Sequence, residues 1–435
     1  MNNIYEIAYA AASNRLCLFT GTGFSKAVSD NEAPGWQKLL EDLCDLLPAA
    51  NNPKNALFPP QGESLLSLEE SAQIISLKFT EQGTDIKEEI KKIIEPIELD
   101  GDIDEIRKFF EENSFRVITT NYDKLAEDLA GETRVQSITP GLPIPRSSTD
   151  VKVYHVHGSV DSAENMVVTS EDYFRFMNSD SYFSRKLSTI LHENTVVILG
   201  YSLADTNLKR IISDYRIFSK NHVIGSNIIF VSRTAIDQHI KDFYYHCFGI
   251  RVLDGVEVER FFERLNRSIP TVKKFIARSL RSIDRVINNG RTFNDKFIKL
   301  EDSFFRFISS LSAKGHRLDN RRVVEVIGEI LHRKKVMTTE DGAWEQYVHL
   351  ASWLIYLGSF FEARGTSIET IYLKAVKRSM ETMSKDRHFG YSWRAYQLWQ
   401  AGWSSINSNN RDLIKRYVER QSLDADALSI VNSVS

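Results

Sequence analysis

Between residues 15 and 255 the chain contains a series of short runs of apolar and β-branched residues that only a few fold classes accommodate. The runs are LCLFT (16–20), FRVIT (115–119), VKVYHV (151–156), TVVIL (195–199), NIIFV (227–231) and IRVL (250–253). Several lack the alternation of a half-exposed antiparallel strand, which is typical of strands buried on both faces. Stretches with helical spacing separate most of them, at 36–47, 84–97, 102–112, 180–192 and 207–216. This succession predicts an α/β fold with a Rossmann-like, doubly wound parallel sheet.

From about residue 257 the pattern changes to long stretches with helical spacing, such as VVEVIGEILHRK and WEQYVHLASWLIYLGSFFEA. We therefore predict two domains, an α/β domain at 1–255 and an all-α domain at 256–435. The second carries all but one of the six tryptophans. Aromatic residues at this density indicate a core or an assembly surface more often than a ligand cage.

The composition of the chain argues against several classes of function. The formal charge is -3 and the pI is near 6.4, which argues against direct nucleic-acid binding through a strongly basic face, although a local basic patch stays compatible with that total. Three separated cysteines form no CxxC pair, so we expect no disulfide framework, no four-thiolate zinc site and a reducing cytoplasm. No stretch approaches the ~20 apolar residues of a membrane span, and we expect neither export nor anchoring.

Two glycine-containing turns follow predicted strands. In LFTGTGFSKA, residues 18–27, the strand runs into Gly21, Gly23 and Ser25. Glycine has no Cβ, so such a turn brings backbone N–H groups close to a diphosphate, but a tight turn after a buried strand explains the two glycines almost as well.

The second glycine turn lies in VVILGYSLADTNLKRII, residues 196–212. Here Gly200, Ser202, Asp205 and Asn207 follow the strand and precede a predicted helix. The serine and the acidic residue either face a ribose or cap that helix.

Two further strands end in polar side chains. VITTNYDKL delivers Asn121 and Asp123, of which the amide can hold a ribose hydroxyl or a water, while either residue can instead be a helix N-cap. VYHVHGSV delivers two histidines. His155 lies within the strand and is expected to be a buried core residue, whereas His157, beside Gly158, is the better general-base candidate. All four loops fall at the same end of the predicted sheet, so we expect a single crevice.

The set Gly-Thr-Gly-Phe-Ser, Thr-Asn-Tyr-Asp, His-Gly and Gly-Tyr-Ser-Leu resembles the sirtuin superfamily over about residues 15–255, in particular its bacterial antiphage branch. The resemblance implies NAD binding. It implies that Gly21, Gly23 and Ser25 contact the NAD phosphates and that Asn121 orders the ribose side of the site. It also implies that His157 is the catalytic base and that Gly200 and Ser202 contact the second ribose. Asp123 matches the acidic residue after the asparagine.

Two departures from the family pattern bear on the activity. Protein-deacylating sirtuins carry a four-cysteine zinc module after the His-Gly motif, but residues 158–193 contain no cysteine. They also carry a Pro-Asp-Phe-Arg element after the glycine turn, where this chain has Ala33, Pro34, Gly35 and Trp36. We therefore expect NAD as the substrate of a metal-independent hydrolase that uses water to release nicotinamide and ADP-ribose.

Because a constantly active NAD hydrolase would harm its own cell, we expect control by assembly or by a partner. The resemblance extends to sirtuin subunits that pair with a HerA-type hexameric ATPase in antiphage defence, and it implies a homo-oligomer acting by NAD depletion. Two alternatives stay open: a non-catalytic module that senses NAD or ADP-ribose, and a nuclease subunit of an ATPase complex, for which no carboxylate set with two-metal spacing is visible.

Overall fold

The computed structural model describes residues 2–61, 65–144, 148–178, 182–202, 212, 228–318, 320–421 and 424–433, and the structural statements below concern these residues. The predicted strand at 227–231 is described from Ile228 onward. The predicted helix at 207–216, apart from Ile212, lies outside the described residues, as does Asp205.

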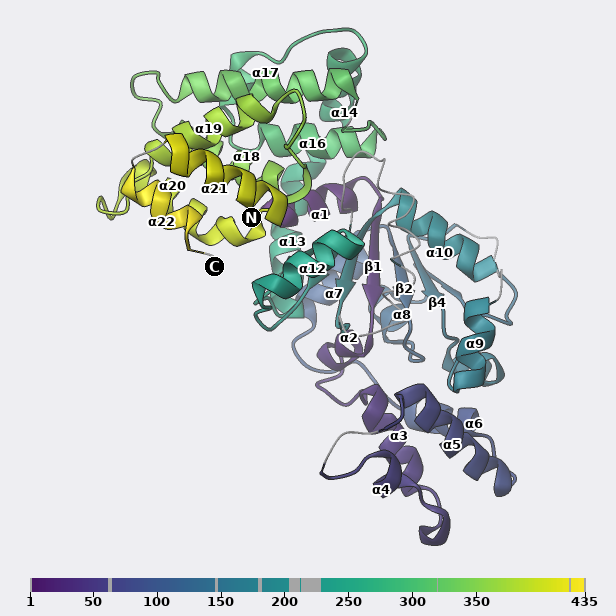
Figure 1. Cartoon of the computed structure of the whole chain (residues 1–435). Helices are drawn as coiled ribbons and strands as arrows, with labels where there is room; N and C mark the ends of the chain where they lie inside the picture. Colours follow the sequence, from purple (N-terminus) through teal and green to yellow (C-terminus); the bar gives the residue numbers. More distant parts are fainter. Residues whose placement is uncertain are drawn as a thin grey trace.

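A seven-stranded parallel sheet forms the centre of the α/β region (Figure 1). Its strands lie in the order β3-β4-β2-β1-β5-β6-β7, and every pairing is parallel. The bounds are β1 (Leu16–Thr20), β2 (Phe115–Thr119), β3 (Val135–Ile138), β4 (Val151–His155), β5 (Thr195–Leu199), β6 (Ile228–Val231) and β7 (Ile250–Leu253). The prediction of a doubly wound parallel sheet is confirmed, and β3 is the described strand that the sequence patterns missed.

The chain first builds the sheet on one side of β1 and then on the other. β2, β4 and β3 lie on one side, and β5, β6 and β7 lie on the other. The order of winding therefore reverses between β1 and β5, which pair in register from Leu16 with Thr195 to Thr20 with Leu199. In open α/β sheets, ligands bind outside the carboxyl ends of the strands at such a reversal.

Helices cover both faces of the sheet because its strands are apolar on both faces. Leu16 and Leu18 of β1 belong to one core cluster, whereas Cys17 and Phe19 belong to another. The first cluster includes side chains of α1, α7, α8 and α13, and the second includes side chains of α10 and α12. The bounds in this region are α1 (Asn2–Ala12), α2 (Thr22–Ala27), α7 (Asp104–Glu112), α8 (Leu125–Ala130), α9 (Ser170–Asn178), α10 (Tyr182–Glu193), α12 (Gln238–Phe248) and α13 (Val258–Lys273).

A small helical lobe is inserted between α2 and α7, and Figure 1 shows it extending from the carboxyl edge of the sheet. Its members are α3 (Trp36–Asp45), η1 (Ala49–Asn51), α4 (Lys54–Leu57), α5 (Leu68–Glu81) and α6 (Ile86–Ile94). Their apolar side chains share a core with η2 (Val160–Asn165). The sequence predicted helices at 36–47 and 84–97 but not their assembly into a lobe.

The C-terminal region is helical, as predicted, and has its own core. Its members are α14 (Ile276–Ile287), α15 (Asp295–Lys299), α16 (Ser303–Ala313), α17 (Arg321–Met337), α18 (Glu345–Phe360), α19 (Glu369–Glu381), α20 (Gly390–Gly402), η3 (Trp403–Ser405), α21 (Ser408–Gln421) and α22 (Ala425–Val431). Trp353, Trp399 and Trp403 are buried in this core, whereas Trp344 is 59% exposed. The division of the chain at residue 255 stays a prediction. Helix α13, which follows it, buries Phe261 and Phe262 in the core of the sheet.

Candidate active site at the carboxyl edge of the sheet

The two glycine turns meet above the reversal point of the sheet. Gly21 N donates to Leu199 O at 3.1 Å, and Gly23 N donates to Gly200 O at 2.8 Å. Gly200 has a φ of +62°, and a Cβ added there would lie 1.9 Å from the backbone nitrogen of Phe24. Only glycine fits this position, because the two backbone segments touch. The close approach brings the loops after β1 and β5 into one surface.

Asn121 follows β2, and its side chain is held in place by hydrogen bonds. Its Nδ2 donates to Ser25 Oγ at 2.7 Å, and Ser25 Oγ donates in turn to Asp123 Oδ2 at 2.7 Å. The other carboxylate oxygen of Asp123 accepts from Leu125 N, the first residue of α8, at 3.2 Å. Asp123 therefore supports the start of α8 and also the Ser25–Asn121 pair. Burial raises the pKa of Asp123 in spite of these hydrogen bonds.

Ser25 is buried below this surface rather than exposed on it. Ser25 is 2% exposed, and its hydroxyl is hydrogen-bonded to both Asn121 and Asp123. The assignment of a phosphate contact to Ser25 stays a prediction, since the structure places its hydroxyl under the amide of Asn121.

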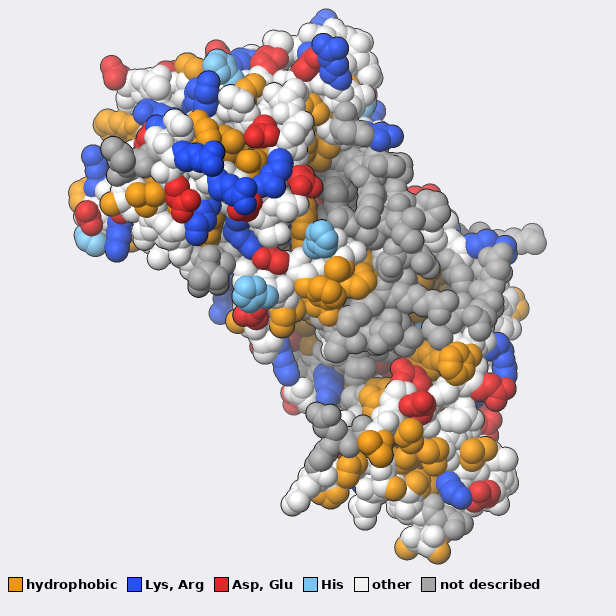
Figure 2. Space-filling view, viewed as in Figure 1, with side chains coloured by type: hydrophobic (Ala, Val, Ile, Leu, Met, Phe, Trp, Pro, Cys, Tyr) orange, Lys and Arg blue, Asp and Glu red, His pale blue; other side chains and the backbone are white. Residues whose placement is uncertain are grey.

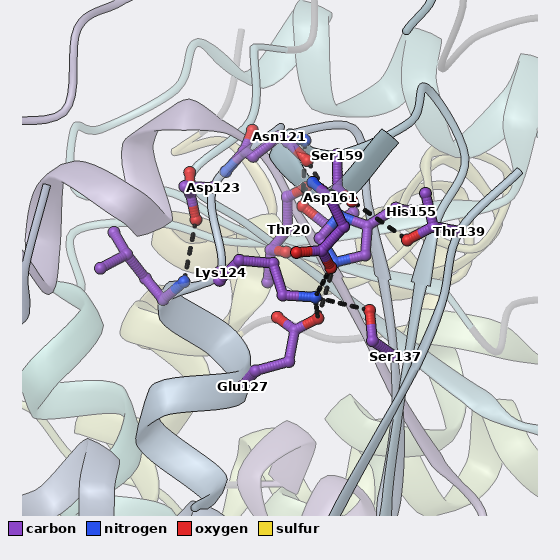
Figure 3. Close-up of polar contacts among 12 residues, drawn as sticks. Thr20, Asn121, Asp123, Lys124, Glu127, Ser137, Thr139, His155, Ser159 and Asp161 are labelled. Atoms are coloured by element: carbon purple, nitrogen blue, oxygen red, sulfur yellow. Dashed lines mark hydrogen bonds and ion pairs between the residues drawn. The ribbon is translucent and has the colours of Figure 1, made fainter. Parts of the chain in front are cut away.

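His155 is a buried residue with both ring nitrogens in hydrogen-bond range of protein atoms. It is 0% exposed, with Nε2 2.8 Å from Glu127 Oε1 and Nδ1 3.2 Å from the backbone oxygen of Asn121. Lys124 adds an ion pair to Glu127 at 2.8 Å and another to Asp161 at 2.6 Å (Figure 3). Burial raises the pKa of Glu127, but attraction to His155 and Lys124 outweighs it and lowers the pKa to about 2. The expectation of a satisfied core histidine agrees with this geometry, and the network reaches the backbone of Asn121.

His157 stands in a contrasting environment. Its Nε2 is buried and has no hydrogen-bond partner among the described residues, and the ring lies edge-on to Tyr173 and Phe176 at centroid distances of 5.2 and 5.3 Å. Burial lowers its pKa to about 4. The imidazole is therefore neutral at pH 7 and has a nitrogen that can accept a proton.

These elements surround a cavity of about 1080 Å³. Seven of the nine candidate site residues line it: Gly21, Gly23, Asn121, Asp123, His157, Gly200 and Ser202. Ser25 lies beneath the lining, and Asp205 falls outside the described residues. The structure thus brings the four sequence motifs to one cavity. Among the described residues, no group of three or more His, Cys, Asp and Glu residues is arranged to hold a metal ion.

Several residues of the cavity wall were missed by the sequence analysis. The helical lobe contributes Leu68 and Glu69, and the loop after β6 contributes Ser232 and Arg233. The β6 loop could have been found, because the strand-end argument applied to the other strands holds for NIIFV as well. The lobe residues had no comparable signal, since their place at the cavity depends on packing between distant segments.

Comparison with known proteins identifies part of this region. Residues 116–253 match the model of the SIR2-like domain family. The chain is 36% identical over 104 residues to an Enterococcus faecium protein named NAD(+) hydrolase ThsA, covering 22% of each protein. It is 23% identical over 261 residues to the defense-associated sirtuin 2 of Bacillus subtilis, covering 59% of this chain and 24% of that protein.

A third relative is the NAD(+) hydrolase ThsA of Cytobacillus dafuensis, 24% identical over 231 residues that cover 50% of this chain and 42% of the relative. The match spans less than half the length of each of these relatives. None of the described helices combines the length and the apolar character needed to span a bilayer.

Proposed function

Starting from a chain that carries a SIR2-like domain at residues 116–253 and resembles bacterial NAD hydrolases, we propose that it hydrolyses NAD to nicotinamide and ADP-ribose. One observation carries the proposal. Asn121, with its amide held by Ser25, and His157, whose neutral imidazole has one ring nitrogen that can accept a proton, line the same cavity at the sheet's reversal point.

The reaction needs the bond between ribose C1′ and the nicotinamide nitrogen to break. The bonding electron pair leaves with nicotinamide, which becomes neutral, and an oxocarbenium-like centre forms on the ribose. A water oxygen then bonds to C1′. Asn121 positions this water and a ribose hydroxyl, and His157 accepts the proton that is released, a general-base contribution of ~10²- to 10⁴-fold.

The remaining predicted residues would bind the rest of the dinucleotide. Gly21 and Gly23 would let the phosphates come close to the backbone, while their own N–H groups remain bonded to Leu199 O and Gly200 O. Gly200 and Ser202 would face the second ribose. Ser25 and Asp123 would act through Asn121, given the hydrogen bonds between them. Asp205 is part of the proposed ribose contact on the sequence argument alone.

We further propose a role in antiphage defence through NAD depletion, supported by the Bacillus subtilis relative, which is named as a defense-associated sirtuin. The cytoplasmic location, the homo-oligomer and the HerA-type ATPase partner are parts of the same proposal, and they rest on the resemblance and the composition. The C-terminal helical region is the proposed assembly surface.

Nicotinamide release from NAD by the full chain, separated by chromatography, tests the activity. We expect release by the unmodified protein and a loss of at least about 100-fold in Asn121→Ala. Asn409→Ala is the matched control, because Asn409 is an exposed asparagine on α21 whose side chain donates to Glu362. Unimpaired turnover by a folded Asn121→Ala protein would contradict the proposal.

The same experiment separates the alternatives. NAD binding without nicotinamide release would identify a sensor, and DNA cleavage abolished by EDTA would identify a nuclease subunit. Either result, with no release from NAD, overturns the hydrolase.

A further inference from the structure

A second cavity lies in the helical region, away from the carboxyl edge of the sheet. It has a volume of about 530 Å³ and is formed by α14, α15, α16 and the segments that join them. Figure 1 places α14 and α16 at the opposite end of the molecule from the helical lobe. A volume of this size falls in the range of roughly 300–1,000 Å³ that is usual for small-molecule sites.

The wall of this cavity is strongly cationic. Arg278, Arg285, Arg291, Lys296 and Arg306 line it, and none of its described lining residues is Asp or Glu. The surrounding sequence, residues 264–299, contains ten Lys or Arg and two Asp or Glu, although the whole chain has a formal charge of -3. The small negative total thus conceals local concentrations of positive charge, and Figure 2 shows further Lys and Arg side chains gathered over α21 in the same helical region.

Most of these charges have no ion-pair partner in the part of the chain that the structure describes. Arg306 pairs with Asp302, Nε to Oδ2 at 2.8 Å, and lies over the ring of Phe275. The four other cations make no ion pair with any described residue. The nearby carboxylates of Asp284 and Asp295 form ion pairs with Lys314 and Arg333 instead. Four guanidinium or ammonium groups are therefore available to an anion, and guanidinium groups match phosphate oxygens in bidentate geometry.

The floor of the cavity is aromatic. Phe293 and Phe297 are stacked at a centroid distance of 4.8 Å, and Phe307 meets Phe293 edge-on at 5.6 Å. Phe293 and Phe297 are half-buried lining residues, so part of their ring surface is open to the cavity. A planar ring such as a nucleobase can pack against such a surface, because every base has a π-face that stacks on aromatic side chains.

From the cationic wall and the aromatic floor together, we infer that this cavity binds a nucleoside phosphate, with the phosphates on the arginines and the base against the phenylalanines. Hydroxyl and amide groups of Ser279, Ser282, Thr292 and Asn294 line the same cavity and provide partners for the sugar. The site is distinct from the proposed NAD cavity, with which it shares no lining residue.

Photoaffinity labelling of the full chain with 8-azido-ADP, followed by peptide mapping, locates the site. We expect label within residues 275–310 and at least 10-fold less of it in Arg278→Gln/Arg285→Gln. The matched control is Arg264→Gln/Arg281→Gln, which removes the same charge from exposed positions on α13 and α14 that do not line the cavity. Label confined to peptides of the sheet edge, or equal loss in both double variants, would overturn the inference.

Calorimetric titration defines the ligand class. ADP is expected to bind at least 10-fold more tightly than inorganic pyrophosphate, because only ADP carries a ring for the aromatic floor. Equal affinity for pyrophosphate, or binding of a single-stranded oligonucleotide without binding of ADP, contradicts the nucleotide assignment. Nicotinamide release by both double variants is measured alongside, so that a failed inference is distinguished from a failed hydrolase.

Discussion

At the residue scale, the environment of His157 determines how it can act. Burial among aromatic rings, with Nε2 lacking a partner among the described residues, lowers its pKa from the usual value near 6.5 to about 4. An imidazole of this kind is neutral over the whole physiological range, so the resting base is ready to accept a proton and readily releases that proton to solvent after each turnover.

The pH dependence of NAD hydrolysis should report this shift. We expect kcat/KM to stay nearly flat from pH 8 to pH 5 and to fall with a midpoint near 4, since the base must be unprotonated in the free enzyme. A midpoint near 6.5 would mean that the base is an ordinary exposed histidine, contrary to the structure.

The same shift has a consequence for stability. Between pH 6.5 and 4 the unfolded chain binds a proton at His157 and the folded chain does not, so the free energy of unfolding falls as the pH falls through this window. Chemical denaturation across that window should show a shallower decline in His157→Asn than in the unmodified protein. An unchanged slope would argue against a buried neutral imidazole.

Substitution of Glu127 should also affect the proposed reaction. We expect Glu127 to act as a positioning residue rather than as a catalytic residue. Glu127→Gln removes the ion pair to Lys124 and weakens the contact to His155, whose ring lies in hydrogen-bond range of the backbone oxygen of Asn121. We expect a loss of about 2–3 kcal/mol in the free energy of unfolding. We also expect kcat to fall more than KM rises.

Kinetics and denaturation of Glu127→Gln beside Glu132→Gln, an exposed glutamate just after α8, would check this. A decrease in stability with unchanged kcat would show that the network only supports the fold.

At the element scale, the site depends on two backbone turns that touch. Gly200→Ala places a Cβ 1.9 Å from Phe24 N at a φ of +62°, so we expect a loss of about 3 kcal/mol or more and weaker NAD binding. Gly255→Ala is the control, with a φ of +68° and no atom within 4 Å of the added Cβ, and it should cost only about 1–2 kcal/mol. Thermal melts of equal midpoint for the two variants would contradict the close contact of the turns.

The individual strands and helices also differ in how well they could be predicted from the sequence. Strands β1 and β5 are short apolar runs that are buried throughout, and their signals depend only on their own residues. β3 was missed because Gln136 and Ser137 interrupt its pattern at the edge of the sheet. The meeting of Asn121, His157 and the glycine turns followed from the rule that parallel strands end at one edge. The position of the lobe that supplies Trp36 did not follow from this rule, because it depends on packing between helices far apart in sequence.

At the scale of the whole molecule, helix α1 connects the sheet with the helical region. Glu6 of α1 accepts from Arg251 of β7 at 2.6 Å and from the hydroxyl of Tyr356 of α18 at 3.0 Å, and all three are buried. Tyr9 of α1 lies 2.7 Å from Ser310 of α16, hydroxyl to hydroxyl. The two regions are therefore linked through polar groups that water does not satisfy.

Removal of Glu6 should consequently affect both regions at once. Glu6→Gln is expected to lower the free energy of unfolding by about 3 kcal/mol, because it removes the carboxylate opposite a buried guanidinium, whereas Tyr356→Phe should cost about 1 kcal/mol. Scanning calorimetry should show one shifted transition. A transition of the helical region that stays in place while the other moves would show that α1 does not couple them.

The central claim is that the cavity at the carboxyl edge of the sheet cleaves NAD with His157 as the base. Its most direct test is nicotinamide release by the full chain and by His157→Ala, each with and without a HerA-type ATPase, beside His239→Ala, which alters an exposed histidine of α12. Release by the unmodified protein and His239→Ala, but not by a folded His157→Ala protein, is the predicted result. Undiminished release by His157→Ala would contradict the assignment of the base, and bound NAD with no release under any condition would contradict the hydrolase itself.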